Sequence, residues 1–98
     1  MSRIELAPEV ADDLDRILGH LGEYEVADAA SRVRDIIAAI DVLARNPLIG
    51  RPEPMGNREL VIGRGPRGYV ALYRYAAAID TVFVLAVRSQ REAGFTPP

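Results

Sequence analysis

Residues 58–90 read RELVIGRGPRGYVALYRYAAAIDTVFVLAVRSQ, and this stretch decides the fold of the chain. It contains three runs rich in β-branched and aromatic residues, at 58–62, 69–76 and about 80–88, which is the composition of β-strands. The connections between these runs, GRGPRG and AAAI, are short. We therefore expect the three strands to pair as an antiparallel meander.

Two amphipathic helices are predicted upstream of the three strands. Apolar residues recur at helical spacing over about 8–21 and again over about 26–44. The link between the two helices is short, so they are expected to form an antiparallel hairpin with one shared apolar face. Residues 2–6 alternate between apolar and polar and predict a short first strand. Residues 47–57 are rich in proline and glycine and are interpreted as a loop.

The order strand, helix, helix, strand, strand, strand predicts a single α+β domain over residues 1–98. We expect a βααβββ arrangement in which the helical hairpin packs on one face of a small antiparallel sheet. The hairpin covers one sheet face only. An antiparallel sheet with solvent on its second face alternates between apolar and polar residues along each strand.

The strands carry more apolar residues than one covered face requires. The strand at 69–76 has apolar residues on both faces, and residues 82–87 are apolar throughout. A large exposed apolar area marks an interaction site, so we expect a partner chain to cover the second face. The alternative is that the tail, residues 91–98, folds back over it.

Charge is divided unevenly along the chain, whose formal net charge is −2. Residues 1–50 carry ten acidic and five basic side chains, whereas residues 51–98 carry four acidic and seven basic ones, so the positive surface belongs to the C-terminal half. All twelve basic residues are arginine, which forms bidentate contacts to carboxylates and phosphates. The strands are expected to gather four of them at one place: Arg58, Arg74, Arg88 and Arg91.

The sequence offers no metal or cofactor site. There is no cysteine and His20 is the only histidine, so a nitrogen or sulfur metal site is excluded. Ser31 and Ser89 have no adjacent histidine to activate them as nucleophiles. Residues 63–70, GRGPRGYV, have the spacing of a kinase phosphate loop, but the chain contains no lysine, and a hairpin turn is the simpler interpretation. No apolar run is long enough to span a membrane, and a cytoplasmic protein is expected.

The order of elements and a set of short motifs resemble the RelE/ParE superfamily of toxins from bacterial toxin–antitoxin modules. The motifs are LAPEVADDLDRI (6–17), NPLIGRP (46–52), RELVIG (58–63), YVALYRY (69–75) and VFVLAVRSQRE (82–92). They cover nearly the whole chain. Their combination is more similar to the ParE branch than to the RelE branch.

The resemblance implies a cytoplasmic toxin that a cognate ParD-like antitoxin neutralises by wrapping its C-terminal segment around it. ParE-like members inhibit DNA gyrase by binding it, need no cofactor or membrane, and contact DNA only through the antitoxin. RelE-like members instead cleave messenger RNA on the ribosome. Val70 stands where those members carry an arginine, and their terminal tyrosine falls near Phe95. Ser89 stands where many relatives in the superfamily carry a histidine, and these three differences favour a binding protein over an enzyme.

The residues expected to contact the antitoxin or gyrase lie on the predicted strands or just after them. They are Arg58, Tyr69, Leu72, Tyr73, Arg74, Leu85, Arg88, Ser89 and Arg91. The arginines would meet acidic groups, and the tyrosines and leucines would seat apolar residues of the antitoxin. No catalytic residue is assigned. The alternatives are a ribosome-dependent endoribonuclease that uses the same arginines, and a degenerate interaction domain without toxicity.

Overall fold

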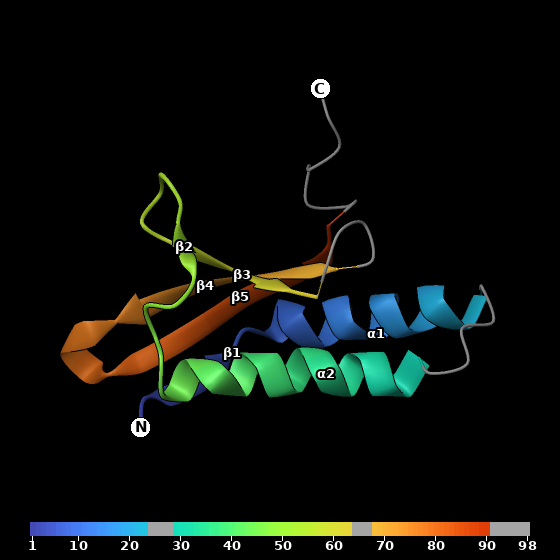
Figure 1. Ribbon diagram of the computed structural model, residues 1–98, viewed down its shortest axis with the longest axis horizontal. Helices are drawn as coiled ribbons and strands as arrows, with labels where there is room; N and C mark the ends of the chain where they lie inside the picture. Colours follow the sequence, from blue (N-terminus) through green and yellow to red (C-terminus); the bar gives the residue numbers. More distant parts are fainter. Residues whose placement is uncertain (24–28, 64–67, 91–98) are drawn as a thin grey trace.

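The computed structural model describes residues 1–23, 29–63 and 68–90. The helices are α1 (Pro8–Glu23) and α2 (Ala29–Asp41). The 3-10 turn η1 (Val42–Ala44) directly follows α2, and the 3-10 turn η3 (Ala77–Ile79) lies between the last two strands. The strands are β1 (Arg3–Leu6), β2 (Arg51–Pro52), β3 (Arg58–Ile62), β4 (Tyr69–Ala76) and β5 (Thr81–Ser89). The predicted order of strands and helices is confirmed, and both helices lie on one side of the sheet (Figure 1).

The five strands form one sheet in the order β1-β5-β4-β3-β2. The strands β3, β4 and β5 pair as the predicted antiparallel meander. Two features go beyond the prediction. The first strand joins β5 in parallel, with Ile4 opposite Val82, so the sheet is mixed. The loop at 47–57 contains the two-residue edge strand β2, in which Arg51 pairs with Glu59 and Pro52 with Arg58.

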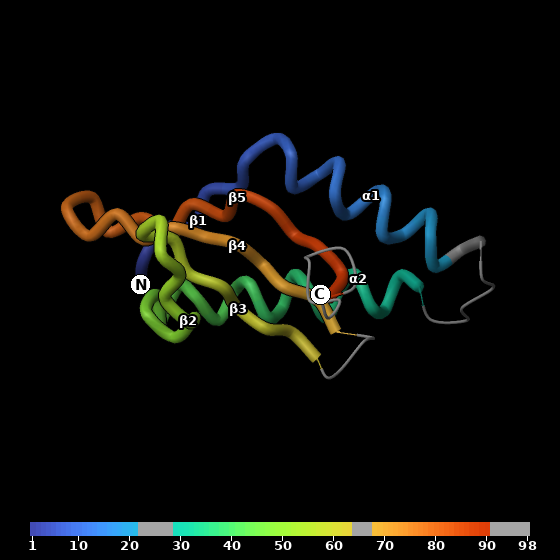
Figure 2. Tube along the Cα trace, turned by 90° about the horizontal axis from the view of Figure 1, so that it is seen from above, coloured from blue at the N-terminus to red at the C-terminus, as the bar shows by residue number. Residues whose placement is uncertain are grey.

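The core lies between the helical hairpin and one face of the sheet. Its buried helical side chains include Val10, Ile17, Ile36 and Ile40. Its buried sheet side chains include Tyr73, Val82, Val84 and Val87. Figure 2 shows α1 running alongside β5, against which it packs, while α2 lies beneath the β3 and β4 side of the sheet.

The pairing of β4 with β5 contains a β-bulge in the middle of both strands. Leu72 pairs with Ala86 and Tyr73 with Val84, so Leu85 is an extra residue on β5. In a bulge of this kind two residues of one strand oppose a single residue of the other. Leu85 and Ala86 therefore both lie opposite Leu72.

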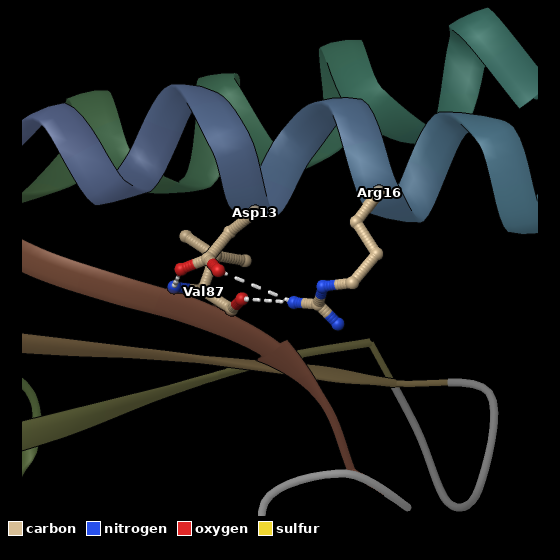
Figure 3. A network of polar contacts seen from close by, with 3 residues as sticks. All are labelled: Asp13, Arg16 and Val87. Carbon is tan, nitrogen blue, oxygen red and sulfur yellow. Dashed lines mark hydrogen bonds and ion pairs between the residues drawn. The ribbon is translucent and has the colours of Figure 1, made fainter.

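Beyond Val84, the outer edge of β5 has no neighbouring strand, because β1 ends at Leu6. Side chains of α1 take the place of a strand there (Figure 3). The N–H of Val87 donates a hydrogen bond of 2.9 Å to Oδ2 of Asp13. Nη2 of Arg16 lies 3.3 Å from Oδ1 of Asp13 and 3.5 Å from the carbonyl oxygen of Val87. This pair satisfies backbone groups that an open sheet edge leaves without partners.

The N-terminus of the chain is tied to the turn before β5. Asp80 adopts the left-handed conformation, with φ of 47°, which aspartate tolerates better than most residues. Its Oδ1 accepts hydrogen bonds of 2.6 Å from the hydroxyls of Ser2 and Tyr75. These bonds hold the pKa of Asp80 below its ordinary value, and the bond to Asp80 raises the pKa of Tyr75.

Candidate partner-binding surface

The strand register separates the two faces of the sheet, because directly paired residues project on the same side. The face against the helices carries Ile62, Tyr69, Ala71, Tyr73, Val84 and Val87. The opposite face, which we call the open face, carries Glu5, Glu59, Val61, Val70, Leu72, Arg74, Phe83, Leu85, Ala86 and Arg88. Neither α1 nor α2 covers the open face (Figure 1).

The middle of the open face is apolar and partly accessible. Leu72, Phe83 and Leu85 are half-buried, and Val61 retains 42% of its exposure, whereas Val70 is buried. An apolar centre of this kind fits the expected interaction surface. The alternative cover, the tail at 91–98, lies outside the described residues.

Charged side chains surround the apolar centre. Arg74 and Arg88 are exposed, and within the described part of the chain neither forms a hydrogen bond or an ion pair. Arg74 pairs with Phe83, and Arg88 pairs with Val70, which precedes Arg74 by four residues in β4. About 13 Å of strand therefore separates the positions of Arg74 and Arg88. The two guanidinium groups therefore stand at opposite ends of the apolar centre.

The carboxylates of the open face already have partners. Glu5 forms an ion pair of 2.7 Å with Arg3, and Glu59 one of 3.8 Å with Arg51. Both pairs are accessible to solvent, so each contributes little to stability. Among the described residues, the unpaired charge on this face is therefore positive, which suits an acidic partner.

The strands do not gather the arginines at one place as expected, because Arg74 and Arg88 stand at opposite ends of the apolar centre and Arg58 lies on the other side of the sheet. Arg58 pairs with Tyr73 and so lies on the helix side of the sheet. Its Nη1 donates hydrogen bonds to the carbonyl oxygens of Gly50 at 2.8 Å and Leu48 at 3.1 Å. This guanidinium stabilises the loop after η1 by donating to two of its carbonyl oxygens.

The tyrosines expected to seat an antitoxin lie in the core instead. Tyr73 is 0% exposed, and its hydroxyl accepts a hydrogen bond of 2.8 Å from the N–H of Gly50. Tyr69 is also buried, and Ser89, its partner in the sheet, shares the helix side. These three residues are not part of the open face. Arg91 lies outside the described residues.

Phe83 is an aromatic residue of the open face that the predicted site lacks. It lies between Arg74 on β4 and Glu5 on β1, in the middle of the sheet. The period of two along a strand places Phe83 and Leu85 together and opposite to Val82 and Val84. The same alternation separates Leu72 from Tyr73, so the sequence contained the signal that these two residues face different sides.

Neither a group of metal-binding side chains nor a membrane-spanning helix occurs in the part of the chain that the structure describes. Within 1–23, 29–63 and 68–90, no three histidine, cysteine or carboxylate side chains gather into a group able to hold a metal. No helix in these same ranges combines the length and apolar character needed to cross a membrane.

The class of protein follows from the fold, since the same architecture occurs in solved toxin–antitoxin systems. The chain is similar to a protein of the chromosomal ParDE toxin–antitoxin system from P. aeruginosa, with a TM-score of 0.74 and 26% identity over 91% of this chain and 96% of that one. It shares its fold with a chain of the toxin–antitoxin complex RelBE2 from Mycobacterium tuberculosis, with a TM-score of 0.54 and 23% identity over 90% and 96% of the two chains. The fold is therefore that of RelE/ParE-type toxins.

The particular family is shown by the sequence. The model of the ParE toxin of the type II toxin-antitoxin system parDE matches residues 4–94. The chain belongs to this family. A comparison with curated proteins gives no match.

Proposed function

We propose that this ParE-family toxin inhibits DNA gyrase by binding it in the cytoplasm, and that a cognate ParD-like antitoxin neutralises it. The observation that carries the proposal is the family match over residues 4–94. The open face, whose apolar centre lies between two unpaired arginines, supports the antitoxin part of it.

The open face suits an acidic amphipathic segment of an antitoxin. Apolar side chains of such a segment would cover Leu72, Phe83 and Leu85, and its carboxylates would meet Arg74 and Arg88. A charge-assisted bidentate pair between arginine and a carboxylate is stronger than a neutral hydrogen bond. A standard interface buries about 1,600 Å² in total, so the segment would extend beyond this centre.

The chemistry available near the arginines favours binding over RNA cleavage. Cleavage at a ribose 2′-hydroxyl needs a general base and a general acid. The only histidine, His20, lies in the last turn of α1, and Glu5 and Glu59 are paired with arginines. A toxin that acts by contact alone needs no such groups.

The test measures both targets side by side. The chain is induced in a bacterial host with and without its antitoxin, and the purified chain is added to a gyrase supercoiling assay and to a translating cell extract. We expect supercoiling to fail while translation continues, and the antitoxin to restore both supercoiling and growth. Translation that stops with cut messages would instead show an endoribonuclease. Normal growth and normal supercoiling would show a degenerate domain.

A further inference from the structure

A second accessible apolar surface lies on the loop between η1 and β3. Leu48, Ile49 and Met55 keep 58%, 57% and 79% of their exposure, and we call them the loop patch. The part of this loop around β2 projects from the body of the molecule (Figure 1). Single exposed apolar residues are ordinary on a protein surface. Three large ones on one short loop require an explanation.

The first half of the loop is held rigidly from beneath. The N–H of Gly50 donates to the buried hydroxyl of Tyr73, and Arg58 donates to the carbonyl oxygens of Gly50 and Leu48. A Cβ on Gly50 would lie 2.6 Å from the Tyr73 ring and hydroxyl and 2.9 Å from the carbonyl oxygen of Glu59. The backbone thus sits directly on the sheet, and Leu48 and Ile49 are left facing solvent.

The second half is closed by its own hydrogen bonds. Glu53 donates its N–H to the carbonyl oxygen of Asn57 at 3.0 Å, and Gly56 donates to that of Glu53 at 3.1 Å. The Glu53 carboxylate accepts the N–H groups of Met55 and Asn57, each at 3.1 Å. The loop is therefore ordered before any partner arrives, which removes an entropic cost of binding.

The charges around the loop patch indicate its partner. Residues 42–58 carry three arginines and one acid, Glu53, whose carboxylate is engaged within the loop. Arg51 is paired with Glu59 on β3, so Arg45 and Arg58 supply the remaining positive charge of the loop. Arg45 is exposed and forms no side-chain hydrogen bond or ion pair within the described ranges. A positive, apolar loop that is already ordered complements an apolar hollow with acidic edges on a folded protein. The antitoxin segment is already assigned to the open face, so the loop patch is left for the protein that the toxin inhibits.

We propose that the loop patch inserts into an apolar hollow edged by carboxylates on the protein that the toxin inhibits, and that this contact is separate from the antitoxin contact on the open face. The inference rests on the proposed function, because it assigns the patch to the toxin's target. It gives Tyr73 and Arg58 a positioning role, since they hold the loop without touching the partner.

The experiment compares a double variant, Leu48→Ser with Ile49→Ser, with the wild-type chain. Three quantities are measured: growth arrest on induction, the concentration that halves supercoiling by purified gyrase, and the dissociation constant for the cognate antitoxin. Thermal melting verifies the fold. The matched control is Leu18→Gln, which removes an apolar side chain of 41% exposure from α1.

We expect the double variant to melt as the wild type does and to bind antitoxin within about twofold of wild-type affinity. It should lose growth arrest and need at least roughly tenfold more protein to inhibit gyrase, as an interface anchor does when truncated. Arg45→Glu should weaken inhibition most at low ionic strength. Leu18→Gln should behave as the wild type.

A double variant that inhibits gyrase and arrests growth as the wild type does overturns the inference. A double variant that no longer binds the antitoxin but still inhibits gyrase also overturns the inference, because the antitoxin then occupies the loop patch. If the wild-type chain arrests growth without inhibiting gyrase, the gyrase part of the proposed function is wrong. The inference about the loop patch then holds if the double variant no longer arrests growth, and it is overturned if the double variant still does. If the wild-type chain neither arrests growth nor inhibits gyrase, both the proposed function and the inference about the loop patch are wrong.

Discussion

Asp80 ties three parts of the chain together through one carboxylate oxygen. It accepts hydroxyl hydrogen bonds from Ser2 before β1 and from Tyr75 on β4, while its own backbone carbonyl accepts the N–H of Arg3. Only an ionised carboxylate accepts both hydroxyl bonds fully, which is why its pKa is lowered. The placement of the parallel strand β1 thus depends on the charge of one exposed residue.

This dependence predicts a loss of stability in acid. Because the folded-state pKa of Asp80 is below the unfolded-state value of about 4, its contribution is present above that value and is lost as pH falls through the folded value. Asp80→Asn keeps a residue that tolerates the left-handed conformation. Melting temperatures of both chains between about pH 7 and pH 2 should converge in acid. A difference that stays constant with pH would contradict the role of the carboxylate.

Adding a methyl group at Gly50 should lower the stability of the folded chain. Gly50→Ala should cost about 1–3 kcal/mol, since its Cβ meets the buried Tyr73 side chain and the backbone of Glu59. Gly19→Ala in α1 is the matched control, because nothing lies within 4 Å of its added Cβ, and it should be neutral or stabilising by up to about 1 kcal/mol. Urea denaturation measures both. Equal stabilities of the two variants would contradict the packing described.

At the residue scale, the alternation along β4 could be predicted, but not which of its faces the helices cover. Tyr69 and Tyr73 could have occupied either face by their spacing alone. Tyrosine has both an apolar ring and a hydroxyl, and here the buried hydroxyl of Tyr73 finds a partner in Gly50, 23 residues away. A contact at that separation leaves no local pattern in the sequence.

Among the elements, β5 depends on a helix to protect its outer edge. Asp13→Ala should destabilise the protein by about 1–3 kcal/mol, because the N–H of Val87 then loses its acceptor in a partly buried place. The neighbouring exposed Asp12 is the matched control, and Asp12→Ala should stay within about 0.5 kcal/mol of the wild type. Chemical denaturation gives both values. An Asp13→Ala variant as stable as the Asp12→Ala variant would show that the edge needs no acceptor.

The elements formed by local patterns could be predicted, and those that depend on distant partners could not. Hydrophobic periodicity was enough to predict α1, α2, β3, β4 and β5. The strand β2 was not predicted, because it consists of an arginine and a proline that form a strand by pairing with β3. The bulge at Leu85 and the parallel pairing of β1 also arise from contacts between strands far apart in the sequence.

In the molecule as a whole, the two faces of the sheet differ: one belongs to the core and the other is left accessible. The helical hairpin supplies the core on one side of the sheet, and the other side keeps an apolar centre between Arg74 and Arg88 (Figure 1). The sequence predicted that such a face exists, from the surplus of apolar strand residues and the positive C-terminal half. It could not assign Arg58, whose guanidinium is engaged by loop carbonyls.

The proposal that the open face binds an acidic antitoxin segment is tested most directly by reversing the charges on that face and measuring the affinity for the cognate antitoxin. Arg74→Glu combined with Arg88→Glu is compared with Arg32→Glu combined with Arg34→Glu, which makes the same change of charge on α2. Isothermal titration gives the dissociation constants, and thermal melting verifies that all chains are folded. We expect the open-face variant to bind at least roughly 100-fold more weakly, at about 1.4 kcal/mol or more for each arginine, and the α2 variant to bind as the wild type does. Unchanged affinity of the folded open-face variant would contradict the proposal.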